Sequence, residues 1–211
     1  MKKRKTIYHL IVDKSGSMND CLEQTINGFN EQVNRIKALE IEFEDEEMTI
    51  GLTTFNSNVK QNYFAVKPSE TVPLTMEDYR PNGSTALLDA IGLTIQQIES
   101  AIKLIPDAVK TSVVVVILTD GYENASRIFD LNAIQHKISK LQEEGNWTFS
   151  FIGATLDAVD IAYKMSINKN NSYVFEKQKM NSEVWDKLSD SMSGYFNKKK
   201  AGKNFNNLFE D

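Results

Sequence analysis

The stretch Ile7-Tyr-His-Leu-Ile-Val-Asp-Lys-Ser-Gly-Ser-Met18 decides the fold of this chain. Its apolar half stops at the carboxylate of Asp13, which is typical of a buried strand that ends in a polar loop. Beyond Met18 a helix is predicted from about Asn19 to Leu39, because apolar residues recur at steps of three and four. The residues that carry this period are Ile26, Phe29, Val33 and Ile36. A strand followed directly by a helix is the first unit of an alternating α/β fold.

The alternation of strands and helices continues along the chain. Val113-Val-Val-Val-Ile-Leu118 is a continuous apolar run, as expected for a strand covered on both faces of a parallel sheet. Further strands are predicted at Met48–Phe55, Trp147–Gly153 and Tyr173–Phe175, and Val59–Val66 is predicted to pair back as an antiparallel edge strand. Further helices are predicted from Ala86 to Ile105, from Ile128 to Leu141, from Asp157 to Met165 and from Met180 to Phe196. This order predicts an α/β fold with a doubly wound, mostly parallel sheet and helices on both faces.

The chain is predicted to form one domain, residues 5–196, followed by a flexible C-terminal tail, residues 197–211. A length of 211 residues suits a single large α/β domain. Residues 67–83 hold three of the four prolines and are interpreted as a long connection. The acidic segment 40–47 is interpreted as a solvated helix end and loop. The tail is expected to be loosely ordered because it combines three consecutive lysines with several asparagines.

The composition argues against several classes of partner. The net charge is -5, which favours neither nucleic acid nor an anionic membrane surface. Cys21 is the single cysteine, so an internal disulfide is excluded. No apolar run approaches the roughly 20 residues needed to span a bilayer. The apolar run after the basic start is too short for a signal peptide. We therefore expect a soluble, cytoplasmic protein.

Three polar segments stand where a doubly wound sheet binds its ligands. Asp13–Met18 leaves the end of the first strand, Asn82–Ala86 precedes a helix, and Thr119–Gly121 leaves the end of the Val113–Leu118 strand. Ligands of such sheets bind at the carboxyl ends of the strands, where the strand order reverses. If the first strand and Val113–Leu118 are neighbours at that point, the three segments meet in one crevice.

The residue types in these segments predict a metal site. Asp13, Ser15 and Ser17 alternate, so an extended loop points their side chains the same way, and Thr85 and Asp120 add a hydroxyl and a carboxylate. All five are hard oxygen ligands, which favours Mg²⁺ or Mn²⁺ over Zn²⁺. Because neutral hydroxyls leave the ion electron-poor, an open coordination position would attract a carboxylate from outside.

This pattern resembles the metal-ion-dependent adhesion site of von Willebrand factor A domains, and the order of strands and helices is similar too. The resemblance implies that Ser15, Ser17 and Thr85 bind the ion directly, and that Asp13 and Asp120 bind through water or hold the hydroxyls in place. It also implies a Rossmann-like fold and a binding module rather than an enzyme. The partner would be a protein that offers an Asp or Glu carboxylate. The lack of a signal, a disulfide and a membrane anchor favours the intracellular bacterial or phage-type members.

Each site residue also has a purely structural interpretation. Asp13 or Ser17 could cap the first helix, and Ser84 or Thr85 could cap the second. Asp120 with the following glycine could form only a turn.

The residues after this turn have two interpretations as well. Tyr122-Glu-Asn124 could line the rim of the site. The alternative is an ordinary loop that leads to a helix cap at Ser126 or Asp130.

Two other classes of function remain open at this stage. In a metal-dependent phosphatase or hydrolase, Asp13 could be the nucleophile while Mg²⁺ stabilises a transferring phosphoryl group. Against this class, the second residue after Asp13 is Ser15 rather than a carboxylate. Nucleotide binding is favoured less, since neither a Gly-x-Gly-x-x-Gly nor a Gly-Lys-Ser/Thr segment follows the first strand.

Overall fold

The structure is a computed structural model that describes residues 4–106, 110–154, 156–167, 169–175, 182–203 and 205–209. The strands are β1 (Arg4–Asp13), β2 (Glu46–Phe55), β3 (Val59–Val66), β4 (Lys110–Thr119), β5 (Trp147–Gly153) and β6 (Ser172–Val174). The helices are α1 (Leu22–Glu42), α2 (Leu87–Ile102), α3 (Leu131–Glu143), α4 (Leu156–Lys164) and α5 (Ser182–Lys200). Short 3₁₀ turns lie at Gly16–Cys21, Pro68–Glu70 and Lys169–Asn171.

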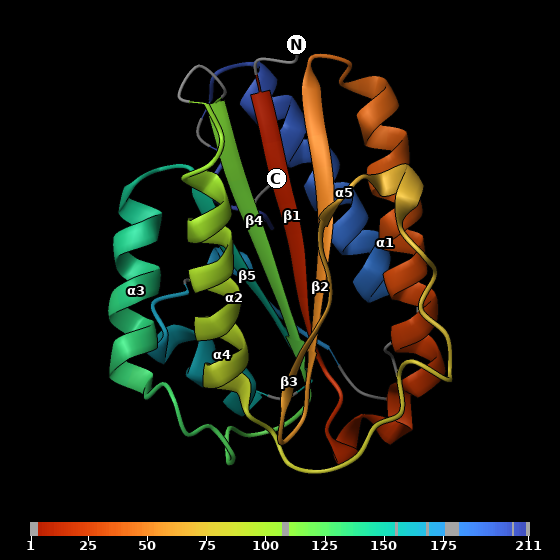
Figure 1. Ribbon diagram of the computed structural model, residues 1–211, viewed down its shortest axis with the longest axis vertical. Helices are drawn as coiled ribbons and strands as arrows, with labels where there is room; N and C mark the ends of the chain where they lie inside the picture. The colour runs from red at the N-terminus through yellow and green to blue at the C-terminus, as the bar shows by residue number, and fades with distance from the viewer. Residues whose placement is uncertain are drawn as a thin grey trace.

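The described strands form one six-stranded sheet in the order β3-β2-β1-β4-β5-β6. β1 lies in the centre and pairs in parallel with both β2 and β4, and only β3 is antiparallel to its neighbour. This arrangement confirms the predicted mostly parallel sheet and its antiparallel edge strand. The strand order reverses between β1 and β4, so the loops that follow these strands open on the same edge. In Figure 1 that edge is at the bottom, because β1 runs downward from the N-terminus.

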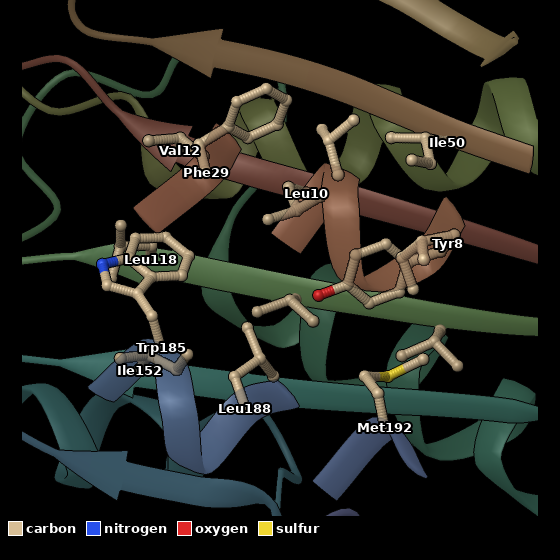
Figure 2. Close-up of a cluster of buried hydrophobic side chains, with 14 of the residues drawn as sticks. Tyr8, Leu10, Val12, Phe29, Ile50, Leu118, Ile152, Trp185, Leu188 and Met192 are labelled. Atoms are coloured by element: carbon tan, nitrogen blue, oxygen red, sulfur yellow. The ribbon is translucent and has the colours of Figure 1, made fainter. Parts of the chain in front are cut away.

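Helices cover both faces of the sheet (Figure 1) and enclose two apolar cores. On one face, α1 and α5 pack against Tyr8, Leu10 and Val12 of β1, as Figure 2 shows with Trp185 of α5 beside them. On the other face, α2 packs against β1 and β2, and α3 and α4 pack against β5, around a core that includes Ile7 and Ile11. Successive strand residues point to opposite faces, so a strand buried on both sides is apolar throughout.

Two predicted helix starts differ clearly from the structure. The regular helix α1 begins at Leu22, because the turn Gly16–Cys21 is wound as a 3₁₀ helix. Ile128 was predicted to begin a helix, but it lies in a loop with 66% of its surface exposed, and α3 begins at Leu131. An apolar residue in step with a helical period need not be helical when an N-cap follows it, as Asp130 does here. Met180, predicted to begin the last helix, lies outside the described residues.

The predicted tail also differs from the structure within its described part. α5 continues four residues past the predicted limit of the last helix, from Phe196 to Lys200, and beyond it Leu208 is buried. The Phe209 amide donates to Asn170 O at 3.0 Å, and the Leu208 amide donates to Asn171 Oδ1 at 2.6 Å. Apolar residues close to the chain end pack against the domain because their burial outweighs the entropy of ordering them.

His9 is a buried polar residue in the middle of β1. Its Nε2 lies 2.8 Å from Thr53 Oγ1, and the Thr94 hydroxyl donates to the same oxygen at 3.1 Å. A Cβ at Gly51 would lie 2.1 Å from His9 Nδ1, so the ring requires a glycine beside it. Burial lowers the pKa of His9 to about 3, because the charged imidazolium would lose its hydration.

The low pKa of His9 makes stability depend on pH. The unfolded chain binds this proton near pH 6.5 and the folded chain near 3, so the stability contributed by neutral His9 is complete above 6.5. It is lost as the pH falls below that value, by about 1.4 kcal/mol per pH unit. Urea unfolding at pH 7 and pH 5 should therefore show that wild type loses about 2 kcal/mol more than His9→Gln between the two values. Parallel pH dependences of the two proteins would contradict the assignment.

None of the described helices is long and apolar enough to cross a membrane.

Candidate metal centre

The three polar segments meet at the carboxyl edge of β1 and β4. Val12 and Leu118 are partners in the parallel register, so the loops after these strands start side by side. The Gly16 amide donates to Gly83 O at 3.0 Å, which joins the loop after β1 to the segment before α2. The structure thus confirms that the predicted segments share one place.

A chain of hydrogen bonds joins four of the five predicted ligands. The Ser15 amide donates to Asp13 Oδ1 at 2.7 Å, and the hydroxyls of Ser15 and Ser17 lie 3.1 Å apart. The Ser17 hydroxyl donates to Asp120 Oδ1 at 2.6 Å. Two carboxylates and two hydroxyls therefore lie together, although 103 residues separate Ser17 from Asp120.

Gly121 marks the place of the fifth predicted ligand. A Cβ built on Gly121 would lie 3.1 Å from Thr85 Oγ1, 3.5 Å from Ser17 Oγ and 3.6 Å from Asp13 Oδ2. The missing side chain of this glycine thus leaves a space bordered by oxygens from three different segments. All five predicted residues contribute to this place in the fold.

Both carboxylates of the site are buried, which disfavours their charged forms. Asp13 is fully buried, and Asp120 is 6% exposed. Burial raises the pKa of Asp13 to about 6, although hydrogen bonds from Thr119 and Ser15 oppose the increase, and the nearby charge of Asp120 raises it further. A cation among these oxygens would offset both the loss of hydration and the repulsion between the carboxylates.

The donor set fits a hard divalent ion. It consists of two carboxylates and three hydroxyls, the oxygen ligands that suit Mg²⁺ and Mn²⁺. Within the described part of the chain, no group of three or more His, Cys, Asp or Glu residues could hold a metal ion. A site for Zn²⁺ normally needs several such ligands, so the chemistry of this place favours the harder ions.

The capping interpretations do not hold for the described helix starts. Cys21 precedes α1 and Ala86 precedes α2, and neither position has a side-chain cap. Asp130, in contrast, caps α3 by accepting from the Ala133 amide at 2.8 Å. None of the five predicted ligands therefore caps α1, α2 or α3 with its side chain.

Two positioning residues next to Asp13 were not predicted. The Thr119 hydroxyl donates to Asp13 Oδ2 at 2.6 Å, and the hydroxyl of the fully buried Tyr79 donates to Asp13 O. Thr119 belongs to the Thr-Asp-Gly segment, so its place in the pattern could have indicated it. Tyr79 lies in the long connection between β3 and α2, where the sequence carries no periodic signal.

The loop after Asp120 holds the start of α2. Asn124 Oδ1 accepts from the Thr85 amide at 2.8 Å, and Glu123 Oε2 accepts from the Leu88 amide at 2.9 Å. Tyr122, which was considered for the rim, is 56% exposed beside them. The structure therefore gives Glu123 and Asn124 contacts that neither sequence interpretation had specified.

Comparison with known protein families places this fold. Residues 9–190 match the model of the von Willebrand factor type A domain. The chain belongs to this family. No curated protein matches this VWA domain in sequence.

Solved structures share the fold of this VWA domain at low sequence identity. The PilB minor pilin from Streptococcus sanguinis has a TM-score of 0.64 at 15% identity, covering 92% of this chain and 62% of that one. A von Willebrand factor type A protein from Catenulispora acidiphila has a TM-score of 0.63 at 15% identity, covering 90% and 43%. The vWF domain of the type V pili tip protein Mfa5 from Porphyromonas gingivalis has a TM-score of 0.61 at 10% identity, covering 89% and 95%. This VWA domain thus spans less than two thirds of the first two chains.

Proposed function

We propose that this VWA domain is a metal-dependent protein–protein interaction module. A bound Mg²⁺ or Mn²⁺ ion would coordinate an Asp or Glu carboxylate of a partner protein. The observation that carries the proposal is the convergence of Asp13, Ser15, Ser17, Thr85 and Asp120 around the space beside Gly121. Oxygen donors from three separate segments meet there at the ligand-binding edge of the sheet.

The five residues divide into two roles in this proposal. The hydroxyls of Ser15, Ser17 and Thr85 hold the ion directly, and the carboxylates of Asp13 and Asp120 act through water or orient the hydroxyls. The hydrogen bond from Ser17 to Asp120 supports the second role. When bound, the ion supplies an electron-poor coordination position for a carboxylate from outside.

The surroundings of Asp13 favour binding over hydrolysis. A nucleophilic carboxylate must reach its substrate, but Asp13 is fully buried. Both of its oxygens also accept hydrogen bonds, Oδ1 from the Ser15 amide and Oδ2 from the Thr119 hydroxyl. The pilin and pilus-tip proteins among the structural neighbours support a role in protein interaction.

Calorimetric titration with Mg²⁺ and with Mn²⁺ tests the metal site. We expect saturable binding of one ion by wild type and an affinity that is lower by roughly tenfold or more in Gly121→Ala. The added methyl would enter the space between the oxygens, and Mg²⁺ tolerates little departure from its octahedral geometry. Gly194→Ala is the matched control, because a Cβ there would have no neighbour within 4 Å. Equal affinity of both variants would contradict the proposed place of the ion.

Metal-dependent binding of a carboxylate is tested with short peptides. We would add Gly-Asp-Gly and Gly-Asn-Gly, each with blocked termini, to isotope-labelled protein and follow the amide resonances of residues 13–17. Shifts caused by the Asp peptide alone, and removed by a chelator, would support the proposal. Equal shifts with both peptides would contradict it.

A further inference from the structure

Asn124 contacts both backbone polar groups of Thr85. Its Oδ1 accepts from the Thr85 amide at 2.8 Å, and the amides of Asn124 and Ala125 donate to Thr85 O at 3.0 and 3.2 Å. Thr85 lies before α2, whose regular hydrogen bonding begins with Leu87. A residue outside the helix needs such partners to keep its side chain in one direction.

Glu123 joins the same loop to the first turn of α2. Its carboxylate accepts from the Leu88 amide at 2.9 Å, which satisfies one of the amides that a helix start leaves open. It also accepts from the amides of Ala125 and Ser126 at 2.9 and 2.7 Å, and from the Ser126 hydroxyl at 2.7 Å. One carboxylate thus holds both the helix start and the shape of the loop.

Asp89 closes this connection from the side of the helix. Its carboxylate accepts from the amides of Arg127, Ile128 and Phe129 at 2.8 to 2.9 Å, and its own amide donates to the Ser126 hydroxyl at 3.0 Å. The loop from Glu123 to Phe129 and the first turn of α2 are therefore joined by hydrogen bonds into one unit. Thr85 lies next to this unit before α2, and Asp120 lies next to it before the loop.

We infer that Glu123 and Asn124 are positioning residues of the metal centre, which fix the Thr85 hydroxyl relative to Asp120. This inference rests on the proposed function, because it assigns the two residues a role toward the same ion. Neither residue needs to touch the ion. They restrict the conformations of Thr85 before the ion binds. Thr85 therefore loses less conformational entropy when the ion binds, and the affinity is higher.

The test compares Glu123→Gln and Asn124→Ala with a carboxylate of the same connection. Asp130→Ala is the matched control, since the Asp130 carboxylate caps α3 through the Ala133 amide and, among the described residues, does not bond the start of α2. In Glu123→Gln an amide nitrogen replaces one carboxylate oxygen. At the Oε1 position it would leave the amides of Ala125 and Ser126 without an acceptor, and at the Oε2 position only the Leu88 amide, so we expect the nitrogen at Oε2. Asn124→Asp retains an oxygen acceptor for the Thr85 amide and serves as the conservative variant.

Two readouts separate positioning from general stability. Calorimetry should show Mg²⁺ affinity lower by roughly tenfold in Glu123→Gln and Asn124→Ala, as is usual when partners of metal ligands are lost. Asp130→Ala should keep the wild-type affinity, and Asn124→Asp should recover most of it. In metal-free protein, the Thr85 amide in Asn124→Ala and the Leu88 amide in Glu123→Gln should exchange with solvent faster, while both stay protected in Asp130→Ala.

The outcomes that overturn the inference differ from those that overturn the proposed function. If wild type binds Mg²⁺ and both variants bind it equally well, only the positioning role is wrong. An equal loss in Asp130→Ala would also overturn that role, because it would point to general destabilisation. If wild type binds neither Mg²⁺ nor Mn²⁺, the proposed function itself is wrong.

Discussion

Asp120→Ala is expected to weaken Mg²⁺ binding severely while the domain stays folded. Asp120 Oδ1 accepts from the Ser17 hydroxyl at 2.6 Å, so the variant loses a carboxylate and also releases a hydroxyl that the proposal assigns to the ion. We expect the affinity to fall roughly 100-fold or more. Mutation of a residue that hydrogen-bonds a metal ligand usually lowers metal affinity by about 10- to 100-fold, so this loss is at or above the upper end of that range. Calorimetry measures the affinity, and thermal unfolding with and without Mg²⁺ measures the stabilisation by the ion.

The metal-free form of Asp120→Ala distinguishes this loss from misfolding. The charge of Asp120 raises the pKa of Asp13, which shows that the two carboxylates repel one another. Removing one relieves this repulsion, so the metal-free midpoint of thermal unfolding should not fall greatly. The increase caused by Mg²⁺ in wild type should disappear in the variant. Undiminished binding by Asp120→Ala would place the ion elsewhere in the chain.

The largest effect on stability is expected from Lys199→Met, at the opposite end of the sheet. Lys199 Nζ lies 2.5 Å from Glu46 Oε1 and 2.8 Å from Thr6 Oγ1, so it joins α5 to β1 and β2. Both charged side chains are buried, with 8% and 4% of their surface exposed. Burial lowers the pKa of Lys199, and the negative charge of Glu46 opposes this. Removing the lysine would leave a buried carboxylate without its cation, at a cost of about 3–5 kcal/mol in urea unfolding.

Two further variants show whether the buried charge causes the loss. Lys5→Met removes the partner of Glu47 from an ion pair of 2.8 Å on the same two strands. That pair is more exposed, at 18% and 46%, so its loss should cost less than about 1 kcal/mol. Glu46→Leu combined with Lys199→Met should recover most of the stability, because no charge is then buried alone. Equal losses in Lys199→Met and Lys5→Met would contradict this account.

Much of the fold follows from local patterns. β3 and β5 have the predicted limits, and the buried strands β1 and β4 include the predicted apolar runs. Such runs are recognisable because a strand covered on both faces has no polar side to interrupt it. Helix limits were predicted less well, as Ile128 shows, because an N-cap such as Asp130 starts the helix after residues that already fit its apolar period.

The contacts of the tail, residues 197–211, could not be predicted from local sequence patterns either. Its polar composition predicts disorder from residue 197, but Lys199 pairs with Glu46, and Leu208 is buried. Neither contact has a local signal, because the partner of Lys199 lies 153 residues away in the chain.

The order of strands and helices, the three polar segments, and the five oxygen-bearing residues in these segments could be predicted from the sequence alone. Local periodicity and residue chemistry are sufficient for these features. The contacts that hold those residues became visible in the fold alone: Tyr79 and Thr119 hold Asp13, and Asn124 holds Thr85. These partners depend on which loops the sheet order brings together, because hydrogen bonds form between groups that are close in space, however far apart they lie in the chain.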